Sequence, residues 1–254
     1  MIRFASLGSG SRGNATLIET GSTCIMLDCG FSETQARKRL SRLDRQPADI
    51  SAILVTHEHS DHINGVGAFA RKHNIPVYLS HGTAAHEKLG ALPQMSVINS
   101  HDCFAIDDLQ CQAFPVPHDA REPLQFVFSD GDKRLGILTD TGSLTSHIKQ
   151  QLDGCDGLLL ECNHDEQMLA DGPYPPMLKQ RVGGRFGHLS NNQANALLTS
   201  LDTADLQSII AMHVSDKNNT PELARYALAD ALDCAEYEIE VADQTDGFDW
   251  HTLA

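Results

Sequence analysis

The chain has 254 residues, 41% of them apolar and 21% charged, which is ordinary globular usage and excludes a largely disordered protein. A formal net charge of −15 disfavours a broad, non-specific grip on duplex DNA, because a strongly acidic protein repels nucleic acid at long range. The seven cysteines form no Cys-x-x-Cys pair, so neither a disulfide framework nor a structural zinc site is expected.

The chain shows no sign of membrane association. It has no apolar run of about 18 residues or more, the length needed to span a bilayer. Its first seven residues lack the longer apolar run and the cleavage site of a signal peptide. Free thiols are typical of a reducing compartment, so we expect a cytoplasmic protein that does not bind membranes.

Hydrophobic patterning predicts short strands alternating with amphipathic helices. The predicted strands cover residues 2–7, 15–20, 23–27, 50–56, 76–79, 96–98, 109–114, 124–129, 134–139, 157–161, 207–212 and 237–242. The predicted helices cover residues 32–44, 63–73, 81–90, 144–152, 190–201 and 221–232. Residues 163–187, rich in Gly, Pro, Arg and Met, are predicted to form a mobile loop near a site. We expect an α/β fold with two sheets and outer helices, in a single domain over residues 1–254.

The strongest chemical signal is the segment 56–62, which begins at the last residue of the predicted strand 50–56. His57 and His59 are two residues apart and point the same way if the segment is extended. Asp61 and His62 follow on the turn into the next helix. Three imidazoles and a carboxylate would make a poor core, because they would bury polar groups without partners. They suit Zn, Mn or Fe, so the segment predicts a metal site.

Three more candidate ligands follow other predicted strands. His118 comes shortly after strand 109–114, Asp140 directly follows strand 134–139, and His213 directly follows strand 207–212. Taken alone, each has a less favoured alternative interpretation as a hydrogen-bonded loop histidine or a turn aspartate. Their regular placement after strands, together with the cluster at 56–62, favours a second set of metal ligands.

The chain resembles the metallo-β-lactamase superfamily. The resemblance depends on Asp28 in Leu-Asp-Cys-Gly, the His57-x-His59-x-Asp61-His62 motif, His118, Asp140 and His213, which occur in the family's order along nearly the whole chain. Segments 6–14, 187–191 and 218–222 are similar to the YycJ/WalJ branch, which lies near the phosphoribosyl cyclic phosphodiesterases and tRNase Z. Val214 follows His213 where the branch tends to have Leu, a conservative departure.

This resemblance implies a four-layer αββα sandwich holding two divalent metal ions, Zn, Mn or Fe. One ion would take His57, His59 and His118, the other Asp61, His62 and His213, with Asp140 between them. Asp28 would orient a ligand histidine from behind. The implied reaction is attack by a metal-bridging hydroxide that Asp61 helps to orient.

A phosphodiester substrate also needs a proton for its leaving oxygen, and Glu161 and His188 are the candidates. Glu161 ends the predicted strand 157–161, and His188 lies just before the helix 190–201. In enzymes similar to tRNase Z, a similarly placed Glu–His pair is thought to transfer that proton. The alternative is that Glu161 is a strand-end charge and His188 an ordinary residue before a helix.

Two weaker features suggest contacts to substrate phosphate. The loop 8–14, with Ser9, Ser11 and Asn14, could present backbone N–H groups to a phosphate, although such a loop is more often a hairpin turn. Lys179, Arg181 and Arg185 form the one basic cluster of the second half of the chain, and arginine suits bidentate phosphate contact. Solvated loop charges explain them equally well.

The sequence therefore predicts a dinuclear metal-dependent phosphodiesterase with nucleic acid as substrate, similar to a 5'-to-3' DNA exonuclease. One alternative is a small-molecule hydrolase, either a cyclic phosphodiesterase or a thioesterase of glyoxalase type. The cyclic phosphodiesterases usually carry an additional Cys-rich zinc site, which Cys24 and Cys29 alone do not make. A metal-binding regulatory protein without turnover is the other alternative. DNA and RNA are not distinguished by the sequence.

Overall fold

The computed structural model describes residues 1–254, which form two compact units. The first unit comprises Met1–Pro115, Ala120–Lys133 and Asp243–Ala254. The second comprises Val116–Asp119 and Arg134–Ala242. The expectation of a single domain over residues 1–254 stays a prediction.

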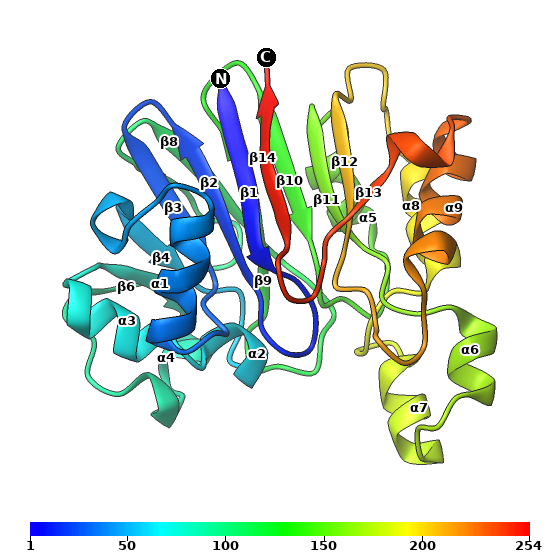
Figure 1. The fold of residues 1–254 in the computed structure, drawn as a ribbon, viewed down its shortest axis with the longest axis horizontal. Helices are drawn as coiled ribbons and strands as arrows, with labels where there is room; N and C mark the ends of the chain where they lie inside the picture. The colour runs from blue at the N-terminus through cyan, green and yellow to red at the C-terminus, as the bar shows by residue number, and fades with distance from the viewer. The chain divides into compact units, whose positions relative to one another are not determined.

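A mixed sheet organises the first unit (Figure 1). Its strand order is β14-β1-β2-β3-β4-β5-β6, antiparallel from β14 to β3 and parallel from β3 to β6. The strands are β1 (Ile2–Gly8), β2 (Ala15–Thr20), β3 (Thr23–Leu27), β4 (Ala52–Leu54), β5 (Val77–Ser80), β6 (Met95–Ile98) and β14 (Phe248–Leu253). The unit also contains the antiparallel strands β7 (Cys103–Ile106), β8 (Leu109–Pro115) and β9 (Leu124–Ser129).

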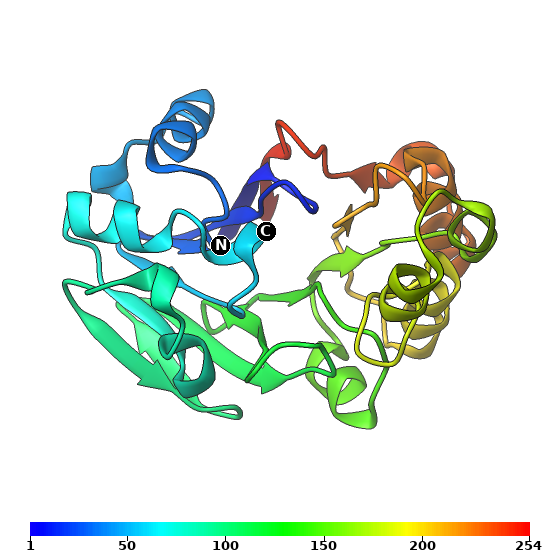
Figure 2. The ribbon, with the colours of Figure 1, turned by 90° about the horizontal axis from the view of Figure 1, so that it is seen from below.

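Helices of the first unit cover this sheet, and Figure 2 shows α1 and α3 on the same face of it. The helices are α1 (Glu33–Arg42), α2 (Ser60–Ile63), α3 (Val66–His73) and α4 (His81–Ala84), with short 3-10 turns η1 (Pro47–Asp49) and η2 (Glu87–Leu89). Ser32 begins α1, because its hydroxyl accepts the otherwise unpaired N–H of Gln35. Arg39 and Arg42 in the last turn complement the partial negative charge at that end of the helix.

The second unit is built on four parallel strands in the order β10-β11-β12-β13. They are β10 (Arg134–Leu138), β11 (Gly157–Glu161), β12 (Ser208–Met212) and β13 (Glu240–Val241). Its helices are α5 (Ser146–Leu152), α6 (Glu166–Asp171), α7 (Pro176–Val182), α8 (Asn191–Ser200) and α9 (Pro221–Leu232), with the 3-10 turn η3 (Glu236–Glu238). Helices α8 and α9 pack side by side (Figure 1).

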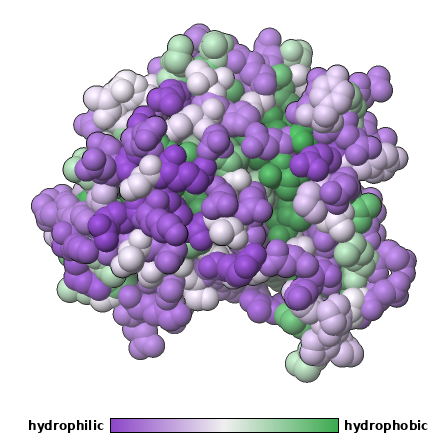
Figure 3. Space-filling model, in the orientation of Figure 1, coloured by the Kyte–Doolittle hydropathy of each residue, from purple (hydrophilic) through white to green (hydrophobic).

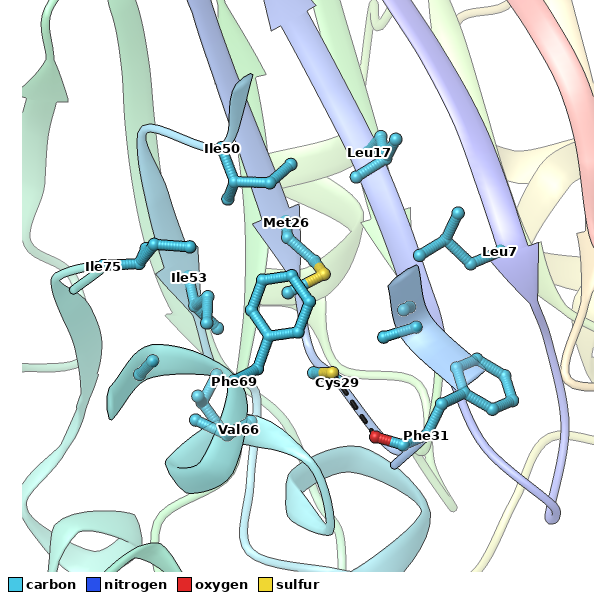
Figure 4. Close-up of a cluster of buried hydrophobic side chains, with 14 of the residues drawn as sticks. Leu7, Leu17, Met26, Cys29, Phe31, Ile50, Ile53, Val66, Phe69 and Ile75 are labelled. Atoms are coloured by element: carbon cyan, nitrogen blue, oxygen red, sulfur yellow. Dashed lines mark hydrogen bonds between the residues drawn. The ribbon is translucent and has the colours of Figure 1, made fainter. Parts of the chain in front are cut away.

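The core of the first unit lies between its sheet and helices α1 and α3. Figure 4 shows Met26 of β3 next to Phe69 of α3, with Leu17 of β2 and Leu7 of β1 farther along the sheet. All four side chains are fully buried, as is Leu40 of α1. Each such side chain contributes about 1.5–3 kcal/mol through its removal from water. This packing holds the ends of β3 and β4 in place, and the candidate site begins at those ends.

Several predicted elements were wrong in type or extent. The predicted loop 163–187 contains helices α6 and α7; Asp165 caps the first, and Pro176 is favourable at the first position of the second. The predicted helix 81–90 is a single α-turn followed by η2, which ends at Gly90 with a φ of 62°. The predicted strand 237–242 is mostly η3, followed by the two-residue strand β13.

The remaining differences concern short elements and boundaries. Strands β7 and β14 were not predicted, because each depends on pairing with a distant or adjacent strand rather than on its own pattern. The predicted helix 63–73 is divided into α2 and α3 around Gly65. The predicted strand 50–56 is shortened to β4.

The outer surface is mostly polar on the face shown in Figure 3. None of the helices is long and apolar enough to cross a membrane. The cytoplasmic location stays a prediction.

The cysteines provide a test of the packing. Burial raises the pKa of the Cys29 and Cys111 thiols to about 12 and that of Cys155 to about 11, so these thiols resist conversion to the reactive thiolate. Cys103 is exposed on β7. Iodoacetamide at neutral pH should therefore label Cys103 rapidly in the native protein, and the buried thiols only in denaturant, as read by peptide mass spectrometry. The variant Cys103→Ser should lose the fast labelling of the peptide that contains residue 103, whereas the half-buried Cys234 should still react, and rapid labelling of Cys29 in the native state would contradict this packing.

Candidate metal centre

In the first unit, the site begins where β3 and β4 end side by side. The two strands are parallel, with Leu27 opposite Leu54, so their carboxyl ends meet at one edge of the sheet. Asp28 follows β3 with a φ of 61°, in the left-handed region that few non-glycine residues adopt. Such strained residues cluster at functional sites, because the surrounding structure must hold them there.

The Asp28 carboxylate is buried and fully engaged. Its Oδ1 accepts the Thr56 N–H at 2.8 Å, and its Oδ2 accepts the Thr56 hydroxyl at 2.8 Å and His62 Nδ1 at 2.7 Å. Since the Thr56 hydroxyl donates to Asp28, its oxygen can accept His57 Nδ1–H, which lies 2.9 Å away. One carboxylate thus fixes two imidazoles, one directly and one through a hydroxyl.

The histidines of the motif lie close together, as predicted. The ring centroids of His57 and His59 are 4.6 Å apart, and those of His57 and His62 are 4.1 Å apart. His57 and His62 are buried, whereas Asp61 and His59 are partly exposed. His59 immediately precedes the short helix α2, whose first turn carries Asp61.

Asn14, predicted as a phosphate contact, lies against the motif. Its Nδ2 donates to Asp61 Oδ2 at 3.1 Å and lies 3.1 Å from His62 Nε2. Its Oδ1 accepts the Gly10 N–H at 2.7 Å, which ties the loop 8–14 to the cluster. Because the Asn14 amide donates toward Nε2 of His62, that nitrogen must be the acceptor and the ring proton must be on Nδ1. The Asp28 carboxylate favours the same tautomer, because it accepts the proton on Nδ1.

In the second unit, acidic and imidazole groups gather at the carboxyl ends of three parallel strands. Asp140 follows β10, Glu161 ends β11 and His213 follows β12. Asp140 and His213 each have a φ of 53°, again in the left-handed region. Parallel strands place their carboxyl ends at one edge of a sheet, which is where α/β proteins bind ligands.

Asp140 is at the centre of this second group. Its Oδ1 lies 3.6 Å from His213 Nε2 and 3.9 Å from His118 Nε2. Donor atoms of Asp140, Glu161, His188 and His213 lie within 4.8 Å of one another, the spacing of a possible metal site. His118 is turned toward Asp140 because its Nδ1 donates to the Gly187 carbonyl at 2.9 Å.

Glu161 and His188 form the predicted pair. His188 Nδ1 donates to Glu161 Oε1 at 2.8 Å, and the carboxylate is fully buried. Its other oxygen accepts the N–H groups of Thr141 and Leu189, each at 3.1 Å. His213 Nδ1 also faces Oε1, at 3.5 Å.

The electrostatics of this pair favour a charged carboxylate and a protonated imidazole. Burial by itself raises the pKa of Glu161, but the attraction of His188 and hydrogen bonds from His188 and His213 lower that pKa overall. Burial likewise lowers the pKa of His188, and the Glu161 charge and hydrogen bond raise it above its ordinary value. The buried Glu161 carboxylate therefore shifts His188 toward its protonated form.

The donor groups have the chemistry that a transition metal or zinc requires. In His57, His62, His118 and His213, the Nδ1 atom faces an oxygen of the protein. A metal-binding histidine almost always donates its other ring N–H in this way, which fixes the ring and makes the free nitrogen more basic. Together with the carboxylates of Asp61 and Asp140, these donors fit divalent ions such as Zn, Mn or Fe.

The remaining predicted phosphate contacts are placed as follows. Ser9 is buried and Ser11 is exposed on the loop 8–14. In the basic cluster, Arg181 Nε donates to Asp119 Oδ2 at 2.5 Å, and Lys179 Nζ donates to the Ala170 carbonyl at 2.5 Å. Arg185 is exposed, and no side-chain contact engages its guanidinium. Their roles toward substrate stay predictions.

Sequence reasoning did not identify two residues that support the donors. Thr56 begins the motif and connects Asp28 to His57, which only the fold reveals. Asn163 lies two residues beyond β11, and its Nδ2 donates to the His213 carbonyl at 2.9 Å. A polar residue closely following a strand was the available signal in both cases.

Comparison with known proteins places the chain in a family. The model of the beta-lactamase superfamily domain matches residues 23–214. Exodeoxyribonuclease YycJ of Bacillus anthracis is 34% identical over 236 residues, 91% of this chain and 89% of that protein. Exodeoxyribonuclease WalJ of Streptococcus pneumoniae (strain D39) is 35% identical over 246 residues, 94% of this chain and 91% of that protein. The chain belongs to the beta-lactamase superfamily and, within it, to the family of these YycJ and WalJ proteins.

A solved structure confirms the fold class. The metallo-beta-lactamase fold protein YhfI from Bacillus subtilis matches 98% of both chains with a TM-score of 0.76. At 15% sequence identity this likeness concerns the fold alone. The predicted α/β class, with two sheets flanked by helices in the metallo-β-lactamase fold, is thus confirmed.

The role of Asp28 generates a prediction. Asp28→Asn keeps the size and tolerates the left-handed backbone, but it removes the negative charge and replaces one of the two acceptor oxygens by an NH₂ donor, so the side chain can no longer accept all three donors of Thr56 and His62. We expect its affinity for Mn²⁺ or Zn²⁺ to fall by about 10- to 100-fold, the usual loss for a partner behind a metal ligand. The measurement is equilibrium dialysis with metal analysis.

A matched control is Asp44→Asn, because Asp44 also has a positive φ, of 54°, and is exposed. It should bind metal like the unsubstituted protein. Equal affinity of Asp28→Asn and the unsubstituted protein would show that Asp28 does not orient a ligand.

Proposed function

We propose that this protein is a metal-dependent exodeoxyribonuclease, a phosphodiesterase that removes nucleotides from a DNA end. The pairing of Glu161 with His188 beside Asp140 carries the proposal. Phosphodiester cleavage needs a proton donor for the leaving oxygen, whereas thioester hydrolysis needs no such pair, because a thiolate leaves readily. The membership in a family with proteins named exodeoxyribonuclease supports the same function.

The metal ligands are proposed from the family assignment. One ion would be held by His57, His59 and His118. The other would be held by Asp61, His62 and His213. Asp140 would contact both ions. The supporting observation is that each unit contains a proposed ligand histidine whose Nδ1 is bonded to a protein oxygen: His62 to Asp28 in the first unit and His118 to the Gly187 carbonyl in the second. When bound, two such ions activate water and offset charge on the phosphate.

The chain's own residues perform the proton transfers. His188 donates its Nδ1 proton to Glu161, so its Nε2–H is the group that can protonate the leaving oxygen. Glu161 stabilises the protonated imidazole, because a fully buried carboxylate requires a positive partner. Asp61, partly exposed in the first turn of α2, accepts a hydrogen bond from the attacking water and orients it.

The first test uses end-labelled single- and double-stranded DNA and bis(p-nitrophenyl) phosphate, after reconstitution with Mn²⁺ or Zn²⁺. We expect cleavage of both substrates, with 5'-to-3' release of nucleotides read from the labelled ends. Asp140→Ala should lose activity and metal together, because it removes a proposed ligand of both ions.

The outcomes separate the alternatives. Cleavage of the small ester alone would favour a small-molecule phosphodiesterase. Cleavage of neither, with metal bound, would indicate a thioesterase or a protein without turnover, and RNA cleavage without DNA cleavage would change the substrate class.

His188 yields a separate prediction. His188→Ala should lower kcat for DNA by about 10²- to 10⁴-fold, the usual contribution of a general acid, while metal content is retained. Exposed His81, which begins α4, supplies the control His81→Ala, with unchanged kcat expected. Metal analysis accompanies the kinetics, and loss of metal from His188→Ala would reassign His188 as a ligand.

A further inference from the structure

The segment between α7 and α8 is held rigidly in the second unit. Three successive carbonyls accept hydrogen bonds: Arg185 from the Ser143 hydroxyl at 2.7 Å, Phe186 from the Asp119 N–H at 3.0 Å, and Gly187 from His118 Nδ1 at 2.9 Å. Gly142 packs so closely on this segment that a Cβ there would lie 2.3 Å from the Gly187 nitrogen. The backbone beside His118 and His188 is therefore fixed.

This rigid backbone presents an aromatic ring to solvent. Phe186 is 58% exposed, whereas the other phenylalanines are buried or, in the case of Phe104, stacked on Tyr78. A single exposed apolar side chain is common and needs no explanation by itself. Here Phe186 lies two residues before His188, and its carbonyl accepts the N–H of Asp119, the residue after His118, so its backbone lies beside two residues of the candidate site.

The adjacent residue adds a cation. Arg185 is exposed, and its guanidinium has no hydrogen bond or ion pair within the protein. By contrast, Arg181 is paired with Asp119, and Lys179 is bonded to a backbone carbonyl. In a chain with a net charge of −15, an uncommitted arginine beside the proton donor is well placed for an anion.

We propose that Phe186 and Arg185 bind the unpaired nucleotide at the end of a DNA strand, the base stacking on Phe186 and its phosphate contacting Arg185. Proteins that bind single strands without sequence preference use such aromatic rings together with cations. Because a base stacks on a side chain only after leaving its neighbours, the inference specifies single-stranded or frayed ends as substrate. It rests on the proposed function.

The test compares Phe186→Ala with Phe186→Trp on single-stranded DNA whose terminal nucleotide is either intact or abasic. On intact DNA, KM of Phe186→Ala should rise about 5- to 100-fold, as expected for the loss of one stacked base, and Phe186→Trp should retain function. With the abasic end, KM of the unsubstituted enzyme should rise to the value of Phe186→Ala on intact DNA. KM of Phe186→Ala should be the same on abasic and intact DNA. Metal content and the thermal unfolding midpoint should be unchanged in both variants.

Two controls make the result specific. Tyr237→Ala removes another exposed aromatic ring of the second unit, 88% exposed on η3, and should behave like the unsubstituted enzyme. Arg185→Gln should raise KM on intact and abasic DNA alike, because it acts on the phosphate. The inference is overturned if Phe186→Ala cleaves DNA with an unchanged KM, or if KM of Phe186→Trp rises as much as that of Phe186→Ala. It is also overturned if the abasic end raises KM of Phe186→Ala as much as it raises KM of the unsubstituted enzyme.

A binding measurement separates this inference from the proposed function. A terminal 2-aminopurine should gain fluorescence on binding to the unsubstituted protein, because it leaves its neighbouring base, and Phe186→Ala should show a smaller gain. If the unsubstituted protein cleaves no DNA but shows the Phe186-dependent gain, the proposed function fails and the binding site stands. If it cleaves DNA without a Phe186-dependent gain, only the stacking contact is contradicted.

Discussion

The hydrogen bonds of the Asp28 carboxylate are the constraint on which the histidine cluster of the first unit depends. A buried charge is costly unless it is paired, and here Thr56 and His62 supply three donors to its two oxygens. The same bonds determine which nitrogen of His62 carries the proton, and through the Thr56 hydroxyl they orient His57. The strained φ of Asp28 is maintained because the alternative would leave these donors and the carboxylate unpaired. The strained backbone at Asp28 is thus the structural cost of orienting the imidazoles of His57 and His62.

Glu161 serves the second unit in the same way. Its two oxygens interact with two imidazoles and two backbone N–H groups, so the end of β11 becomes the fixed point for His188 and His213. These carboxylates count in the net charge of −15, yet they face imidazoles in the interior and not solvent. The net charge therefore overstates how strongly the protein surface repels a nucleic acid.

The parts of the site that sequence predicted are those whose signal is local. His57, His59, Asp61 and His62 lie within six residues, so their proximity follows from the chain itself. The residues after β10, β11 and β12 were predicted because parallel strands bring their carboxyl ends together, and Asp140, Glu161 and His213 do lie within reach of one another. Helices α6 and α7 were missed because Gly and Pro obscure periodicity, and β14 because it is stabilised by pairing with β1 across the length of the chain. Thr56 was missed as a connection because no pattern shows that its hydroxyl lies between two partners.

The charge of the chain also limits how it can bind a polyanion. A protein that grips a long duplex relies on many cations, whereas removal of one terminal nucleotide at a time needs contacts to that nucleotide alone. Stacking of a base on Phe186 involves no net charge, so it is unaffected by repulsion from acidic side chains elsewhere. Repulsion between exposed charges is itself screened beyond about 10 Å at ordinary salt, so Arg185 acts on the nearest phosphate within that range. An acidic surface with one aromatic ring and one free cation beside the proton donor therefore favours strand ends over duplex interiors, which is the selectivity an exonuclease requires.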